Sequence, residues 1–473
     1  MTTALYEPPR PIPKGPIASL IRVMRQGDGD LLSLLPAQAY TMPIGNLGWS
    51  RRSIVIVNAP DLARTILTDP TDIYPKNDLM VGALEPLVGR SIFVSGGEEW
   101  RRQRRMIDPA FSHIRIGKAF AAMAAAVDDH EEQLARHARD GTAFSLDLAM
   151  SHLTADIITR TVFSTPLADG TAKEVYEAFA VFEKSVAHVE VRRLIFDPPF
   201  TKIPHHDHVL AACATIRRHI GDLVDKTLAA GGDGSADIAA MLATAKDEET
   251  GARFTRDELI DELGVFFLAG HETTASALTW AVFILATRGE HADRLRAEAG
   301  DGALGFEDVR RLAFARNVFK ETLRLYPPIT FIPRVAAETA TIGGRRVKRG
   351  AMIMIAPWAI HRHHAYWENP HAFDPDRFSP EREGALTAGA YMPFGLGPRV
   401  CVGANFATVE SALILARLFR RFDVEVLAPE RVAPAARLTT RPREQIMVRV
   451  RERRRHAPDA RATRCPASPP PPG

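Results

Sequence analysis

The sequence predicts a mainly α fold, in which one large helical body carries a small β-rich portion. Long stretches rich in Ala, Leu, Glu and Arg fill residues 100–319, and their apolar residues recur with helical spacing. Runs with strand character are few and short. Near the middle of the chain, residues 255–288 form a helical pattern with a long apolar run that other elements have to enclose.

The domain organisation follows from length and composition. The 473 residues would suit about three domains of about 150 residues, yet no clear linker divides them. The Gly-rich Gly231–Ser235 reads as a loop between helices. We therefore expect a Pro-rich leading segment and the start of the β portion at 1–50, a single domain at 51–450, and a disordered, basic and Pro-rich tail at 451–473.

Charge and cysteine content exclude several classes of protein. Sixty Lys and Arg against 57 Asp and Glu leave +3, so nothing indicates global attraction to nucleic acid or anionic lipid. The three cysteines, Cys213, Cys401 and Cys465, lie far apart and exclude a disulfide framework, and no two have the spacing of a zinc cluster. The first residues lack the apolar core of a signal peptide or membrane anchor, so the cytoplasm is the expected compartment.

The remaining elements are predicted in chain order. Periodic apolar residues predict amphipathic helices at residues 116–139, 151–164, 173–189 and 207–229. Short runs rich in branched apolar residues predict strands at 53–57, 341–342, 352–355 and 446–450.

The central helix begins with a capping box, because Thr255 is followed three residues later by Glu258. Between Leu263 and Ala286 it is apolar nearly all round, which also fits a membrane span. A carboxylate in the middle of that run argues against a span, so we expect a buried core helix. The polar group at 270–274 has two readings of equal weight: a functional site, or a glycine for close packing beside a locally bonded threonine.

A second informative segment surrounds Cys401. Two glycines and a proline precede it in FGLGPRVCVG, residues 394–403, and a helical pattern follows. These residues predict a tight loop that places the thiol at the start of a helix, where the helix dipole stabilises a thiolate. A lone thiolate in an apolar setting suits ligation of haem iron. A cysteine that is merely a small buried hydrophobe would require coincidence across several positions.

The chain resembles the cytochrome P450 family in five motifs. Its haem-thiolate signature F-x-x-G-x-R-x-C-x-G matches at every specified position of residues 394–403. Similar in order and separation are W-x-x-x-R at Trp100–Arg104, the oxygen-activation motif at Ala269–Thr274, E-x-x-R at Glu321–Arg324, and FDPDRF at 373–378. Together they span residues 100–403. The resemblance implies the P450 fold, with a small β-rich portion and a central haem.

The resemblance also implies how haem b would be held. Cys401 would be the axial iron ligand, with Gly397 and Gly403 allowing close backbone approach and Phe394 shielding the thiolate. The groups expected to meet the haem propionates are Trp100, Arg104, Arg399 and Arg334. Glu321, Arg324 and Arg377 would form a structural network that fixes the segment before the cysteine loop.

On the opposite face of the haem, Ala269 and Gly270 would leave room for dioxygen and substrate. Thr273 would hydrogen-bond the oxygen being activated, and Glu272 would connect that proton path to solvent. This acid–threonine pair favours a monooxygenase that uses O2, two electrons and two protons. Two alternatives stay open: a non-catalytic haem sensor on the same scaffold, and a peroxide-driven peroxygenase or isomerase.

The expected partners are an electron donor and a hydrophobic substrate. The resemblance fills nearly the whole chain, so a separate ferredoxin or flavoprotein reductase would supply electrons. Arg101, Arg102 and Arg105 are candidates for docking an acidic partner, although a solvated basic helix face explains them equally well. Apolar segments expected to line the substrate cavity are 79–81, 266–269 and 329–332. The substrate itself stays open among fatty acids, terpenoids, steroids and aromatic compounds.

Overall fold

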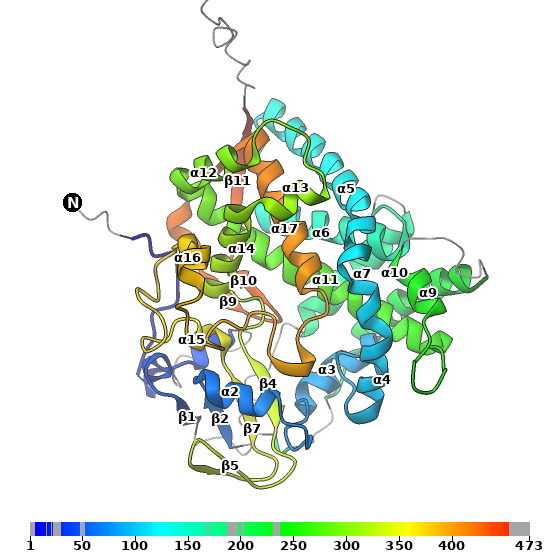
Figure 1. The fold of residues 1–473 in the computed structure, drawn as a ribbon, viewed down its shortest axis with the longest axis vertical. Coiled ribbons are helices and arrows are strands. Elements are labelled where there is room, and N and C mark those ends of the chain that lie inside the picture. The colour runs from blue at the N-terminus through cyan, green and yellow to red at the C-terminus, as the bar shows by residue number, and fades with distance from the viewer. Residues whose placement is uncertain are drawn as a thin grey trace, which may run out of the picture.

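A computed structural model of the chain describes residues 5–15, 17–19, 21, 30–47, 53–167, 170–186, 197–199, 203–229 and 237–453 (Figure 1). The expected loop at 231–235, residues 454–473 of the expected tail and Cys465 lie outside these residues. Arg451 and Glu452, which the sequence assigns to the tail, instead pair with Asp423 and Phe422 in a sheet, so the boundary predicted at 451 is too early.

Helices make up most of the described chain. The four predicted amphipathic helices are α5 (His113–Asp140), α6 (Leu146–Phe163), α7 (Gly170–Val186) and α9 (Asp207–Ala229). Residues 187–189, the predicted end of the third, lie outside the described part. The other helices are α2 (Pro60–Leu67), α3 (Asp78–Val88), α4 (Gly97–Ile107), α10 (Ile238–Thr244), α11 (Arg256–Thr287), α12 (Gly289–Ala299), α13 (Phe306–Arg311), α14 (Ala313–Leu325), α15 (Pro357–Ile360), α16 (Pro380–Glu383) and α17 (Ala404–Arg421).

The β portion consists of small sheets, and its largest lies at one end of the molecule, away from most of the helices (Figure 1). That sheet has the order β1 (Ile44–Leu47), β2 (Ile54–Val57), β7 (Met352–Ile355), β4 (Ile332–Val335), with only the β2–β7 pair parallel. Its two central strands, β2 and β7, are apolar and fully buried, whereas the edge strands β1 and β4 are partly exposed. The remaining sheets are β3 (Phe144–Ser145)–β11 (Met447–Glu452)–β8 (Phe422–Val426), β9 (Pro434–Ala436)–β10 (Thr440–Pro442) and β5 (Ala340–Ile342)–β6 (Arg345–Val347).

The central helix α11 is a core helix, as the sequence predicts. Thr255 and Glu258 form the capping box at its start. It packs against α6, α9, α14, α3 and α17, and its apolar side chains from Leu263 to Leu285 are buried because these elements surround it. Among the described residues, no helix combines the length and apolar character needed to cross a membrane.

Glu321, Arg324 and Arg377 form a buried ion network that contacts the segment before the cysteine loop. Arg324 donates from two nitrogens to the Glu321 carboxylate, both at 2.7 Å, and Arg377 Nε donates to Glu321 Oε1 at 3.3 Å. The other donors of Arg324 bond the carbonyls of His361, Pro370 and Ala372 at 2.7 to 2.8 Å. All three charged side chains are buried, so the network ties α14 to the 361–377 segment.

His361 extends this network to the segment that leads into the cysteine loop. Its Nδ1 bonds the Arg324 carbonyl, and its Nε2 accepts from the Met392 amide at 2.9 Å. Burial, with Arg324 and Arg362 nearby, lowers the pKa of His361 to about 3, so the ring is neutral and can accept.

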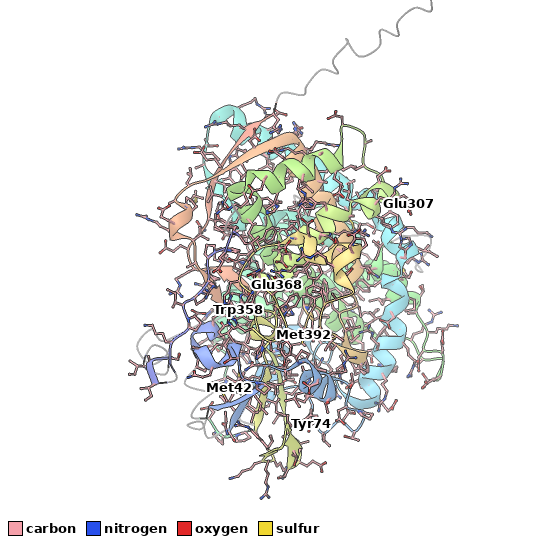
Figure 2. The ribbon with its side chains drawn as sticks, turned by 60° about the vertical axis from the view of Figure 1, so that its left-hand side comes forward. Met42, Tyr74, Glu307, Trp358, Glu368 and Met392 are labelled. Atoms are coloured by element: carbon pink, nitrogen blue, oxygen red, sulfur yellow. The ribbon has the colours of Figure 1, made fainter. Side chains whose placement is uncertain are left out.

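Met392 and Trp358 lie in the interior, whereas Glu307 lies on the outer surface (Figure 2).

Candidate active site around Cys401

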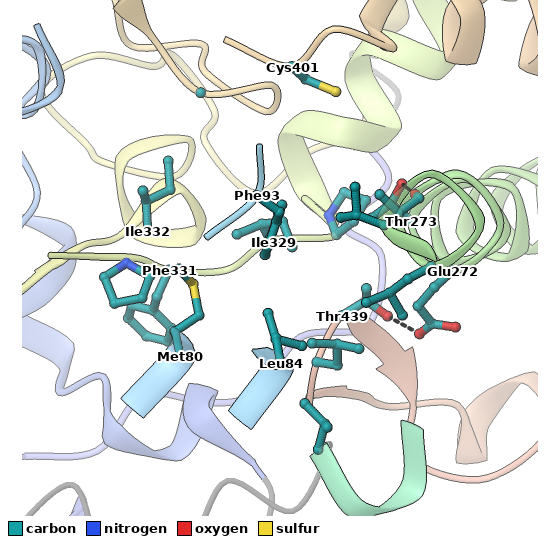
Figure 3. A pocket seen from close by; sticks show the side chains of 18 of the residues that line it. Met80, Leu84, Phe93, Glu272, Thr273, Ile329, Phe331, Ile332, Cys401 and Thr439 are labelled. Atoms are coloured by element: carbon teal, nitrogen blue, oxygen red, sulfur yellow. Dashed lines mark hydrogen bonds between the residues drawn. The ribbon is translucent and has the colours of Figure 1, made fainter. Parts of the chain in front are cut away.

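A cavity of about 1050 Å³ lies between α11, α3 and the cysteine loop. In Figure 3, Cys401 lies on one side of it, Met80 and Leu84 lie on the opposite side, and Thr273 lies on α11 at its flank. Most of the lining is apolar, which suits a hydrophobic ligand. The cavity thus brings together the cysteine loop and the polar group of the central helix, about 130 residues apart in sequence.

The cysteine loop is tight, as predicted, and glycine is required in it. Gly397 has φ +73°, and a Cβ there would lie 2.7 Å from Thr68 Cγ2 and 3.0 Å from the Leu67 carbonyl. The loop is closed by the Cys401 amide, which donates to the Phe394 carbonyl at 2.9 Å. A Cβ on Gly403 would lie 3.9 Å from Cys401 Sγ, so the backbone there approaches the sulfur closely.

Cys401 lies three residues before α17, and its side chain is accessible from the cavity that it lines. The thiolate expected from the helix start is not favoured by the protein alone. Burial raises the pKa of Cys401 more than the Gly403 amide and Arg104 lower it. A coordinating metal ion deprotonates a thiol outright, so iron would supply what the helix dipole does not. Phe394 packs with Ala277, Phe319 and Leu323 beside the loop.

The residues predicted to meet propionates all line the cavity. The Arg399 guanidinium lies 4.2 Å from the centre of the Trp100 ring and donates to the Ser95 carbonyl at 3.1 Å. Arg104 donates to the Val400 carbonyl at 2.6 Å and pairs with Asp108 at 2.6 Å, so part of its donor capacity holds the cysteine loop. Burial and the charge of Arg399 lower the pKa of Arg334 to about 10.

Lys76 joins this group of cations, although no sequence motif marks it. Its Nζ donates to the Ile92 carbonyl at 3.0 Å and to the Phe93 carbonyl, and it lines the cavity. Burial, Arg399 and Arg334 lower the pKa of Lys76 well below its usual value. No salt bridge joins Lys76, Arg334 or Arg399 to a carboxylate of a described residue. Three neighbouring cations without such partners fit the carboxylates of a haem, so these residues can hold its propionates.

On α11, the structure supports both readings of the polar group. A Cβ on Gly270 would lie 2.6 Å from Ile158 Cδ1, so close packing against α6 requires this glycine, although Gly270 also lines the cavity. Thr273 Oγ1 donates to the Ala269 carbonyl at 2.7 Å, and both residues line the cavity. Both parts of the packing reading are therefore present, a closely packed Gly270 and a locally bonded Thr273, while the place of Thr273 on the cavity wall is also what the functional reading requires.

Glu272, which is predicted to connect a proton path to solvent, is itself only 5% exposed. Arg441 donates to both of its oxygens, and Thr439 Oγ1 donates to Oε1 at 2.6 Å (Figure 3 shows the Thr439 bond). Although burial opposes it, this pairing with Arg441 lowers the pKa of Glu272. Arg441 and Thr439 come from the short β9–β10 hairpin, which no sequence motif marks.

The three arginines proposed for partner docking are already paired. Arg101 pairs with Glu98 at 2.6 Å, Arg102 pairs with Glu258, and Arg105 pairs with Asp247 at 3.0 Å. Because these arginines pair with acidic residues of the same molecule, a paired basic helix face accounts for them without a docking partner.

The apolar lining agrees with most of the predicted segments. Leu79, Met80, Phe266, Leu268, Ala269, Ile329, Phe331 and Ile332 line the cavity. Phe267 instead packs on Phe179 of α7, with ring centres 4.3 Å apart. Cys213 is buried in α9, where burial raises the pKa of its thiol to about 11, and it lies apart from this site.

A cavity with a thiol at one wall, cations without carboxylate partners around it and a threonine on an apolar helix defines a haem-thiolate type of site. The family model for cytochrome P450 matches residues 9–449. The chain belongs to the cytochrome P450 family. It is therefore a monooxygenase of the oxidoreductase class, with haem held by a cysteine thiolate.

Curated relatives and solved structures agree with this membership. The chain is 31% identical to cyclooctatin synthase of Streptomyces melanosporofaciens, over 90% of this chain and 91% of that protein. It is 31% identical to cyclooctat-9-en-7-ol 5-monooxygenase of the same organism, over 83% and 84%. It is 29% identical to a cytokinin hydroxylase of Arabidopsis thaliana, over 81% and 76%. In structure it is similar to the cytochrome P450DA heme domain, with a TM-score of 0.80, 24% identity, and 95% and 98% of the two chains covered.

Proposed function

We propose that this protein hydroxylates a hydrophobic small molecule, with Cys401 as the axial ligand of haem b. The observation that supports this most directly is the shared cavity, onto which Cys401 and Thr273 both face between apolar walls. When bound, haem supplies the redox centre at which dioxygen is reduced and one of its atoms is inserted into a C–H bond. The cation group of Arg334, Arg399 and Lys76 would hold its propionates, with Arg104 beside them.

The chain's own residues would control protons and water. Thr273 reaches the cavity with a hydroxyl that both donates and accepts, so it can pass a proton to oxygen held there. Glu272 is the adjacent carboxylate, and Arg441 and Thr439 keep it ionised and oriented. To serve as a proton carrier it has to exchange partners, because in the described arrangement its oxygens are occupied and little exposed.

For the substrate, we propose an uncharged or weakly polar apolar molecule. The lining from α3, α11 and the 329–332 segment presents mostly aliphatic and aromatic carbon. One relative is named for an unsaturated alcohol, cyclooctat-9-en-7-ol, and this favours testing cyclic alcohols beside fatty acids, steroids and aromatic compounds. A ligand-induced shift of the Soret band, recorded across such a panel, would identify the class that displaces water from the iron.

We further propose that a separate ferredoxin or flavoprotein reductase supplies the electrons, and that residues 51–450 form the catalytic unit. The family model fills residues 9–449, which supports assigning the described chain to the haem-binding part alone. The low number of cysteines supports a reducing compartment, such as the cytoplasm, as the place where the protein functions.

The decisive experiment is the carbon monoxide spectrum of the reduced holoenzyme. Thiolate ligation by Cys401 predicts the red-shifted Soret band of this family, and Cys401→His should replace it with an imidazole-type spectrum while haem stays bound. If the wild-type spectrum is already imidazole-like, the assignment of Cys401 is wrong. Oxidation driven by reductase and NADPH, but not matched by hydrogen peroxide alone, would separate a monooxygenase from a peroxygenase; no electron-dependent oxidation of any panel compound would favour a sensor.

A further inference from the structure

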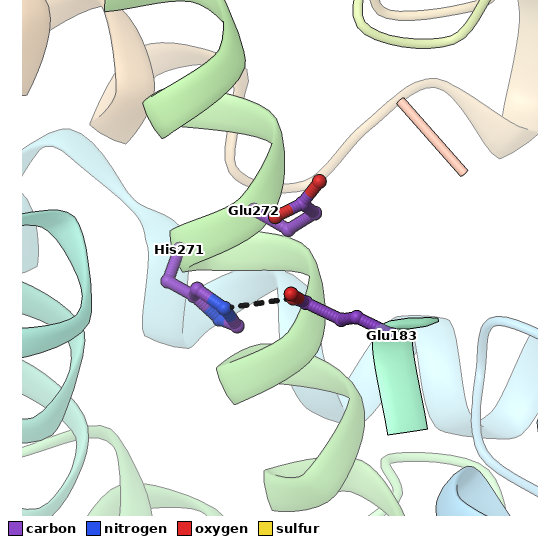
Figure 4. A group of neighbouring side chains, drawn as sticks. All are labelled: Glu183, His271 and Glu272. Atoms are coloured by element: carbon purple, nitrogen blue, oxygen red, sulfur yellow. Dashed lines mark ion pairs between the residues drawn. The ribbon is translucent and has the colours of Figure 1, made fainter. Parts of the chain in front are cut away.

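His271 separates Gly270 from Glu272 on α11, and the proposed function gives it no role. Its ring is 2% exposed and is enclosed by Phe179, Tyr176 and Phe267, with ring centres 5.0 to 6.3 Å away. Its Nε2 lies 2.9 Å from Oε1 of Glu183 on α7 (Figure 4). This contact joins two helices across the buried interior.

The contacts of the ring fix where its protons are. Nδ1 lies 2.8 Å from the Phe267 carbonyl, which can only accept, so Nδ1 carries a hydrogen. The Nε2–Oε1 contact with Glu183 is an ion pair without the alignment of a hydrogen bond, and it requires a second proton, on Nε2. Removing that proton leaves the Nε2 lone pair facing a carboxylate, and the contact is lost.

The surrounding charges favour the state in which His271 carries its second proton. Glu183 lies near Glu272, because one ligand atom from each of Glu183, His271 and Glu272 falls within 4.8 Å of the others. Arg441 balances one of these two carboxylates, and a protonated His271 balances the other. Although burial opposes it, Glu183 raises the pKa of His271. The other titratable or charged groups facing the pair are Tyr176 on α7, His152 and Asp147 on α6, and Arg441 on β10.

The helix α7 is also a wall of the cavity. Val181, Lys184, Ser185 and Val186, which flank Glu183, all line it. Along its length α7 packs on α9, and side-chain contacts such as His271–Glu183 and Phe179–Phe267 join it to α11. The carboxylate of Glu183 is therefore placed to hold this wall against the helix that carries Glu272 and Thr273.

We propose that Glu183 and His271 are positioning residues, whose ion pair holds the α7 wall of the cavity closed against α11 beside Glu272. The proposal rests on the proposed function, since it takes this cavity as the haem and substrate site. It predicts that ligands leave the cavity more quickly when the pair is broken, and that pH controls the rate in the wild type.

The test measures dissociation of 1-phenylimidazole, an uncharged azole that coordinates haem iron, from ferric holoenzyme by stopped flow at the Soret band. In the wild type, dissociation should be slow at low pH and become faster as pH rises through titration of the pair. Glu183→Ala should raise the low-pH rate about tenfold and remove the pH dependence, because no carboxylate remains to pair with His271.

Glu183→Gln gives the sharper result. Its amide can donate to Nε2 of a neutral His271, so dissociation should stay slow and should no longer depend on pH. Glu177→Ala is the matched control, because Glu177 lies on the same helix, is exposed, and pairs only weakly with Lys173 at 3.9 Å. It should keep both the wild-type rate and the wild-type pH profile.

Two outcomes would overturn the proposal: a wild-type rate that does not change with pH, or a Glu183→Ala profile that matches the wild type. Comparing variants at equal haem content excludes misfolding as the cause. An imidazole-like carbon monoxide spectrum would contradict the proposed function itself. A thiolate-type spectrum combined with unchanged dissociation rates would contradict only the role of Glu183 and His271.

Discussion

Two threonines of α11 make the same local hydrogen bond in different surroundings. Thr273 donates to Ala269 at 2.7 Å and lines the cavity, whereas Thr279 donates to Ala275 at 2.8 Å and is fully buried. We predict that Thr273→Ala lowers product formed per electron consumed by about tenfold or more, because proton delivery is lost. The measurement is the ratio of product and hydrogen peroxide to NADPH, with any substrate found in the spectral panel.

Thr279→Ala is the matched control for this prediction. It removes a hydroxyl of the same kind from the same helix, so its effect on helix stability should be similar while coupling stays at the wild-type ratio. Equal coupling in Thr273→Ala and in the wild type would remove Thr273 from proton delivery.

Lys76 should destabilise the apoprotein but stabilise the binding of haem. Its charge is desolvated and lies near those of Arg334 and Arg399, and carbonyls rather than carboxylates bond it. We predict that Lys76→Met stabilises the apoprotein yet speeds loss of haem about tenfold, since a partner of the propionates is gone. Thermal unfolding of apoprotein and transfer of haem to apomyoglobin measure the two effects. Lys118→Met, at an exposed position of α5, should change neither.

At the scale of elements, the Glu321 network ties α14 to the 361–377 segment through one carboxylate. Removing its charge by Glu321→Gln leaves Arg324 and Arg377 buried without an anion, which should cost about 3–5 kcal/mol of unfolding free energy. Because the segment behind the cysteine loop loosens, haem content should fall too. Glu307→Gln breaks only the exposed pair with Arg310 and should cost less than about 1 kcal/mol. Urea unfolding of both variants checks the contrast, and equal losses would contradict it.

The elements that the sequence predicts well are those with local signals. The capping box at Thr255, the periodic pattern of 207–229 and the strand at 352–355 all appear at or within a residue of their predicted positions. These signals depend on residues no more than four positions apart, so they survive any tertiary arrangement. The cysteine loop was predictable for the same reason, because its glycines and proline act within the loop.

Residues that act across the fold could not be predicted in this way. Arg441 follows Glu272 by 169 positions, and Glu183 precedes His271 by 88; only packing of α7, α11 and the β9–β10 hairpin brings them together. Lys76 likewise acquires its cationic neighbours from chain more than 250 residues later. The burial of Glu272 and its pairing with Arg441 could not be predicted either, because a carboxylate in an apolar helix needs a partner and the sequence does not say which arginine provides it.

At the scale of the whole molecule, the cavity interrupts an otherwise well-packed interior. The largest apolar cluster joins α5, α6, α11, α12, α14 and α17 and lies mostly away from the cavity. A second cluster joins α3, α7, α9 and the first half of α11. The cavity of about 1050 Å³ lies where these clusters approach the cysteine loop, with cations beside it that pair with no carboxylate of the described residues. Haem therefore fills both a volume and a charge requirement of the fold.

Removing haem should for this reason destabilise the two parts of the molecule unequally. We predict that apoprotein keeps the helical circular dichroism of the main cluster, because that cluster contains its own packing partners, while thermal unfolding begins at a lower temperature than in holoenzyme. Sodium chloride should raise the unfolding temperature of apoprotein more than that of holoenzyme, since only the apoprotein has Lys76, Arg334 and Arg399 without an anionic partner to screen. Lys76→Met should reduce this salt effect. An equal response to salt in both forms would show that these cations do not depend on the haem carboxylates.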